Sequence, residues 1–251
     1  MRSPLTLLPI LLLIALSLAG CRREVVVQED GLVLHYREDP YKEPNGFAVR
    51  NLAKSDTDMV AELHMNASLS DLRTLMEKLY RRNPAELYKV GSNDPARRAR
   101  AVFDDHDFSD LTGLNGARDI EAMKLAFDPA FTGDRVLALV GGMADMIMAS
   151  YGHKSEFYVY DELDPQKLHD AARNIEIAVW RLSNSHDADG RLFLISNSGP
   201  EDEVANLSYE RLFGKLIGRQ DMIAQIVADK SDRAIKGMVQ TVASALFIPI
   251  P

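Results

Sequence analysis

The most constraining feature of this sequence is an apolar segment in its middle. From Val136 to Tyr151 the chain carries one charged residue, Asp145, among mainly alanine, leucine, valine, isoleucine and methionine. A helix that is apolar on all sides must be covered by other elements. The segment is also shorter than the roughly 20 residues that a helix needs to cross a bilayer. It therefore predicts a helix at the centre of a folded domain.

Helical periodicity recurs on both sides of this segment. Apolar residues spaced by three and four occur over the ranges 72–79, 120–127, 207–227 and 235–246. A longer stripe of the same kind runs from Leu168 to Leu182. Asp94-Pro95 and Asp164-Pro165 are typical helix starts, because aspartate caps backbone N–H groups and proline fits the first turn. These patterns predict a mainly α, bundle-like domain over residues 51–251.

A minor β element is expected beside the helices. The mainly apolar runs 25–28 and 32–36 flank the turn sequence Asp30-Gly31, which predicts a hairpin near residues 25–36. The short runs 157–160 and 192–195 consist mainly of aromatic and aliphatic residues and are predicted to be strands.

The N-terminal end has a different pattern. Arg2 precedes an apolar run from Leu5 to Ala19, and small residues lead to Cys21, the only cysteine of the chain. The run is too short for a spanning helix, which favours a signal sequence. The segment Leu18-Ala19-Gly20-Cys21 resembles the lipobox of bacterial lipoproteins. The resemblance implies a signal peptide over residues 1–20, recognised through Leu18, Ala19 and Gly20, and lipid attachment at Cys21.

Further expectations follow from that resemblance. Two or three acyl chains, such as palmitate, are enough for stable membrane anchoring, whereas one chain is marginal. Arg22, rather than aspartate, follows the lipidated cysteine, which implies the periplasmic face of the outer membrane. The outer leaflet of the inner membrane remains the alternative. Residues 21–50 would form the lipidated N-terminus, with the possible hairpin and a tether. No other cysteine is present, so the domain must fold without disulfides.

Charge is distributed unevenly along the chain. The net charge is −8, which argues against nucleic acid as a partner. The segment 78–100 nevertheless holds seven lysines and arginines against two acidic residues. Arginine suits bidentate contacts with phosphate and carboxylate groups. The candidate anion-binding patch consists of Arg81, Arg82, Arg97, Arg98 and Arg100. The alternative is two solvated helix ends, with Arg81 and Arg82 complementing a helix C-terminus.

Motifs for catalysis or metal binding are weak. The carboxylate-rich segments 104–110 and 187–190 have spacings typical of loops, and no metal site or cofactor is predicted. The histidines show no ligand spacing, and a catalytic elbow or phosphate loop does not occur. Asp145 must find a partner if it is buried, and a structural role is favoured over a functional acid. The sequence thus predicts no catalytic residue, although an enzyme is not ruled out.

These observations lead to one functional expectation with two alternatives. The chain is expected to be a lipid-anchored envelope protein whose periplasmic domain binds another envelope component, in an accessory or assembly role. That component would be an envelope protein or an anionic envelope polymer. The alternatives are an envelope enzyme acting on peptidoglycan or lipid, and a carrier with a small-ligand pocket among the methionine-rich helices.

Overall fold

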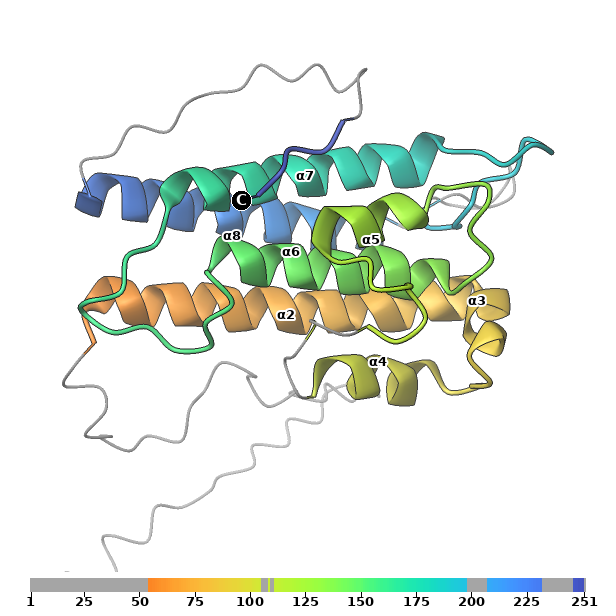
Figure 1. Cartoon of the computed structure of the whole chain (residues 1–251), viewed down its shortest axis with the longest axis horizontal. Helices are drawn as coiled ribbons and strands as arrows, with labels where there is room; N and C mark the ends of the chain where they lie inside the picture. The colour runs from red at the N-terminus through yellow and green to blue at the C-terminus, as the bar shows by residue number, and fades with distance from the viewer. Residues whose placement is uncertain (1–53, 105–107, 109–110, 198–206, 232–245, 251) are drawn as a thin grey trace, which may run out of the picture. The chain divides into compact units, whose positions relative to one another are not determined.

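The computed structural model describes residues 54–104, 108, 111–197, 207–231 and 246–250 (Figure 1). All of them belong to one compact unit that begins at Pro40. The expected signal peptide, Cys21 and the hairpin near residues 25–36 lie outside the described residues. The expected helix 235–246 lies outside them too, apart from its last residue.

The described part of the chain is mainly helical, as predicted. Its longest helix, α2 (Asp56–Arg82), begins well before the range 72–79 that the periodicity marks. Ser55 caps it: its hydroxyl accepts from the Asp58 N–H, and the Asp58 carboxylate accepts from the Ser55 N–H at 2.7 Å. Ser68 lies in the middle of this helix, where its hydroxyl donates to the His64 carbonyl one turn back.

The core consists of α2 with four further helical segments. The prediction of a central helix is confirmed: η3 (Leu137–Gly141) and α6 (Gly142–Ser150) are buried almost throughout. Helix α7 (Pro165–Asn184) covers α6 on one side, and α8 (Ser208–Ser231) packs between α7 and α2 (Figure 1). None of the described helices is both long and apolar enough to cross a membrane.

Three short helices cover this core. Helix α3 (Pro84–Lys89) continues directly from α2, and α4 (Pro95–Phe103) packs against α2. Helix α5 (Asp119–Leu125) packs against η3 and α6 (Figure 1). The predicted aspartate caps are confirmed at the starts of α4 and α7, where the carboxylates of Asp94 and Asp164 accept backbone N–H groups.

The contact between α5 and α6 depends on one glycine. A Cβ atom on Gly142 would lie 2.7 Å from the carbonyl oxygen of Asp119 and 2.8 Å from the backbone nitrogen of Met123. Only glycine therefore fits this close approach. Gly214 and Gly218 share one face of α8, but a Cβ atom on either would meet nothing within 4 Å.

The predicted strands at 157–160 and 192–195 were wrong. Within the described residues the only β-type pairing is an isolated bridge between His186 and Leu192. At the end of the second run, the Asn83 side chain forms two hydrogen bonds with the backbone of Ile195. Its Oδ1 accepts from the Ile195 N–H at 2.8 Å, and its Nδ2 donates to the Ile195 carbonyl at 2.9 Å. A side chain at the end of α2 thus makes the hydrogen bonds that a neighbouring strand would otherwise make.

Side chains also replace a strand partner in the first run. The Phe157 N–H donates to the Glu62 carboxylate at 2.7 Å, and the Tyr158 N–H donates to Asp161 at 2.9 Å. Phe157 is buried, whereas Val159 and Tyr160 are exposed. The run therefore forms part of a loop that is fixed against α2.

Candidate functional site

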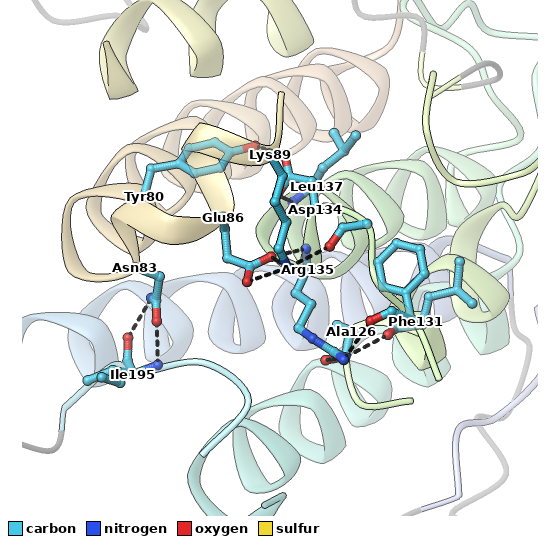
Figure 2. Close-up of polar contacts among 12 residues, drawn as sticks. Tyr80, Asn83, Glu86, Lys89, Ala126, Phe131, Asp134, Arg135, Leu137 and Ile195 are labelled. Carbon is cyan, nitrogen blue, oxygen red and sulfur yellow. Dashed lines mark hydrogen bonds and ion pairs between the residues drawn. The ribbon is translucent and has the colours of Figure 1, made fainter. Parts of the chain in front are cut away.

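The end of α2 at Arg82 meets α3, the start of η3 and the loop 185–197. We call it the distal end, because it lies one helix length, about 40 Å, from Lys54 at the other end of α2. Figure 2 shows the polar contacts that join these elements. Asn83 joins the loop to the end of α2. Two further networks of polar contacts connect the helices at this end of the domain.

The first network centres on Glu86 and Arg135, both of which are buried. Glu86 accepts from the Arg135 backbone N–H at 2.7 Å and from Lys89 Nζ at 2.7 Å (Figure 2). The Arg135 guanidinium donates to the carbonyls of Leu125, Ala126 and Phe131. Burial lowers the pKa of Arg135, and the Glu86 charge opposes that effect. The network links α3 to η3 and α5.

The second network joins α2 to η3 and α4. Tyr80 Oη donates to Asp134 Oδ2 at 2.5 Å, and Asp134 Oδ1 accepts from the Leu137 N–H at 2.9 Å (Figure 2). Burial raises the pKa of both Tyr80 and Asp134, so Tyr80 keeps its proton as a donor. Arg98 approaches the same carboxylate, with 3.7 Å between its Nη2 and Asp134 Oδ2.

The structure distributes the five predicted patch arginines over two helices. Arg81 and Arg82 are exposed at the C-terminal end of α2, and Arg81 pairs with Glu77. Arg97 and Arg100 are exposed on α4, whereas Arg98 between them turns inward to Asp134. Anion binding by the exposed members stays a prediction.

The distal end also exposes apolar side chains, which the sequence analysis missed. Tyr88 and Val90 follow Asn83 closely in the chain, and Ile195 is the residue that Asn83 holds. Tyr88 is 66% exposed and Ile195 is 42% exposed. Such isolated apolar residues in short segments give no periodic signal. We call the set Arg81, Arg82, Tyr88, Val90 and Ile195 the distal surface.

A second cluster surrounds Asp145, which is 1% exposed. Arg118 donates to both of its carboxylate oxygens, from Nε at 3.1 Å and from Nη2 at 2.9 Å. The Asp119 N–H donates to Asp145 Oδ2 at 3.1 Å, and His153 Nδ1 lies 3.8 Å from Oδ1. The expectation that this carboxylate finds a partner is confirmed.

The backbone around Asp145 is strained. Asp119 and His153 have φ values of 38° and 55°, which side-chain-bearing residues rarely adopt. Burial raises the pKa of Asp119, and the Asp145 charge adds to the effect. Two carboxylates and an imidazole therefore converge here, beside the half-exposed Arg118. Sequence spacing could not have revealed this set, because it comes from three separate segments.

The carboxylate-rich segments have other partners where the structure describes them. Asp187 and Asp189 both bind Arg191, within the turn that precedes the 192–195 run. Asp104 lies 3.8 Å from Arg73. Over the described ranges, no three His, Cys, Asp or Glu side chains are placed to hold a metal ion.

A third feature lies at the other end of α2. Val159 and Tyr160 are 67% and 76% exposed, and the Tyr158 and Tyr160 rings stack with their centroids 5.8 Å apart. Met59 and Leu63 are exposed on the same end of α2. We call Met59, Leu63, Tyr158, Val159 and Tyr160 the tether-end surface.

Comparisons with protein-family models, with curated proteins and with solved structures find no match for this chain. Function is therefore inferred from the two exposed surfaces and the Asp145 cluster.

Proposed function

We propose that this chain is a lipid-anchored bacterial envelope protein whose helical domain binds another envelope component, in an accessory or assembly role. The lipobox-like segment ending at Cys21 supports the anchor. Because Arg22 follows this cysteine, the proposed location is the periplasmic face of the outer membrane. The outer leaflet of the inner membrane is the alternative.

The distal surface is the observation that carries the binding role. Tyrosine and arginine are enriched among the residues that dominate protein interfaces. Tyr88 lies on α3, which follows directly on the end of α2 that carries Arg81 and Arg82. The networks beneath it hold α3, η3 and the loop at Ile195 to one another. A surface that is already ordered loses little conformational entropy on binding, which favours affinity.

The chemistry of this surface favours a protein over a polymer. Arginines complement carboxylates, and Tyr88, Val90 and Ile195 add aromatic and aliphatic area of the kind found in the cores of protein interfaces. The proposed partner is therefore an envelope protein with an apolar contact region bordered by acidic residues.

Site-specific photo-crosslinking of the intact lipoprotein in its native envelope tests this proposal. A benzophenone side chain at position 88 should give a discrete protein adduct. The same group at position 222 on α8, where Met222 is 58% exposed, should not. Arg81→Ser combined with Arg82→Ser should lower the yield of the position-88 adduct several-fold. Absence of any adduct from position 88 would contradict the proposal.

An envelope enzyme remains the second candidate, because one cluster could support acid–base chemistry. Asp119 and His153 have strained backbones and border the buried Asp145 carboxylate. Strain and converging ionisable groups are common at functional sites. A hydrolytic assay on peptidoglycan and phospholipid, comparing the parent with His153→Ala, distinguishes this candidate: only an enzyme would show an activity that the substitution removes.

A further inference from the structure

We propose that the tether-end surface rests on the phospholipid bilayer that carries the lipid anchor. This inference depends on the proposed anchor at Cys21 and adds the face by which the domain meets the membrane.

The loop 151–164, between α6 and α7, lies beside the start of α2 (Figure 1). Lys54 Nζ lies 5.3 Å from the centroid of the Tyr158 ring and donates to Glu62. Glu62 also accepts from the Phe157 N–H at 2.7 Å. Residues 158–160, of which Val159 and Tyr160 are exposed, therefore lie where the chain that leads to Cys21 joins the described domain.

The anchor makes an encounter with the bilayer frequent but does not fix its geometry. Residues 22–53 could reach about 110 Å if they were fully extended, which would permit many orientations of the domain. A tethered surface nevertheless faces the membrane at a high effective concentration, so modest affinity is enough to hold it there. A surface with interfacial chemistry would then select one orientation.

Tyrosine provides that chemistry. Its ring is apolar and its hydroxyl is polar, and tyrosines are enriched at the level of lipid headgroups. The rings of Tyr158 and Tyr160 are nearly parallel, at 11°, and Tyr158 Oη donates to Glu156 Oε2 at 2.6 Å. The pair is thus ordered before contact. Val159 between them, together with Met59 and Leu63, supplies apolar area for the boundary between headgroups and acyl chains.

Charge at this end indicates which lipids are involved. Lys54 is paired with Glu62, and Lys154 is paired with Asp161. Membrane attraction through basic residues requires a cluster of lysines or arginines, and both of these lysines have carboxylate partners. We therefore assign the surface to zwitterionic phospholipid, and the contact should depend little on salt.

Fluorescence quenching in vesicles tests the inference on the full lipidated protein. Cys21 carries its lipid on sulfur, so Val159→Cys introduces a single free thiol for an environment-sensitive NBD label. Tyr88→Cys on the distal surface is the matched control, because the two parent residues are 67% and 66% exposed. The vesicles contain phosphatidylcholine and phosphatidylethanolamine with bromine-labelled acyl chains.

The expected result is a blue-shifted emission at position 159, with at least twofold more quenching than at position 88, in both low and high salt. Leu63→Cys on α2 should behave like Val159→Cys, which guards against a local effect of one label. Circular dichroism of each labelled protein checks that the helices are intact.

Different failures have different meanings. Equal, weak quenching at positions 159 and 88 in protein that floats with the vesicles would overturn the membrane contact and leave the anchor proposal standing. Protein that does not float with the vesicles would overturn the anchor and, with it, this inference. An emission shift at position 159 that requires added envelope protein would assign the surface to a protein and also overturn the inference.

Discussion

Asn83, which caps the C-terminal end of α2, binds the backbone of Ile195 as a neighbouring β-strand would, with one donor and one acceptor from the same amide group. Asn174 on α7 binds Ile248 in the same way, at 2.8 and 2.6 Å. Each asparagine is buried. Two extended segments are thus held to helices by side chains, without a sheet.

This relationship predicts that loss of the Asn83 side chain markedly lowers the stability of the fold. Asn83→Ala removes three side-chain hydrogen bonds, two to Ile195 and one to the Leu79 carbonyl. It leaves backbone groups of Ile195 without these partners, so it should lower the free energy of unfolding by about 2 kcal/mol. Chemical denaturation measures the change. The control Asn184→Ala removes one exposed bond to Trp180 and should cost less than about 0.5 kcal/mol. Equal effects would contradict the bridging role of Asn83.

Alanine substitutions of Gly142 in α6 and Gly218 in α8 should change the stability of the fold in opposite directions. Gly142→Ala forces a methyl group against the backbone of Asp119 and should destabilise the fold by about 2 kcal/mol or more. Gly218→Ala in α8 meets open space and should stabilise it by about 0.5–1 kcal/mol, since alanine favours helix. Thermal unfolding compares the two variants. A stable Gly142→Ala protein would refute the close approach of α5 and α6.

Substitutions of Arg118 and Asp145 should lower the stability of the fold by different amounts. Arg118→Ala leaves a buried carboxylate without its guanidinium and should cost about 3 kcal/mol. Asp145→Asn should cost less, about 1–2 kcal/mol, because the half-exposed Arg118 can turn toward water and the amide oxygen can still accept from Asp119. Urea denaturation of both variants measures the difference, and the reverse order would contradict a structural role for the pair.

Gln220 in α8 is fully buried, and within the described residues neither of its amide atoms has a hydrogen-bond partner. Replacing it with a similarly sized apolar residue, Gln220→Met, removes the desolvation cost and should stabilise the fold by about 1–2 kcal/mol. Thermal unfolding at neutral pH measures this. Destabilisation would instead indicate that Gln220 binds a buried water or ligand, as a small-ligand carrier would require.

Acidification should weaken the fold through His64. Burial lowers the pKa of His64 below its usual 6.5. As pH falls below about 6.5, the unfolded chain takes up a proton that the folded protein does not, so stability decreases until the lowered pKa is reached. His64→Gln should flatten the stability profile between pH 7.5 and 5.5. His186→Gln, a histidine substitution at an exposed position, is the control.

The helical class and several helix boundaries could be predicted from the amino-acid sequence alone. Asp94 and Asp164 cap their helices as predicted, and the apolar stretch around Asp145 forms the centre of the domain. Capping and helical periodicity involve residues within one or two turns, so a single sequence carries that information. The proposed lipid attachment at Cys21 likewise depends on a contiguous motif.

Other features depend on contacts between segments that are distant in the chain. The runs 157–160 and 192–195 have strand-like composition, but such a run forms a strand only where another backbone is available to pair with it. Here the side chains of Glu62 within α2 and of Asn83 at its C-terminal cap supply the hydrogen bonds. Arg98 likewise turned inward because Asp134, distant in sequence, lies beneath α4. Contacts between residues far apart in the chain depend on how the helices pack, and no local pattern encodes them.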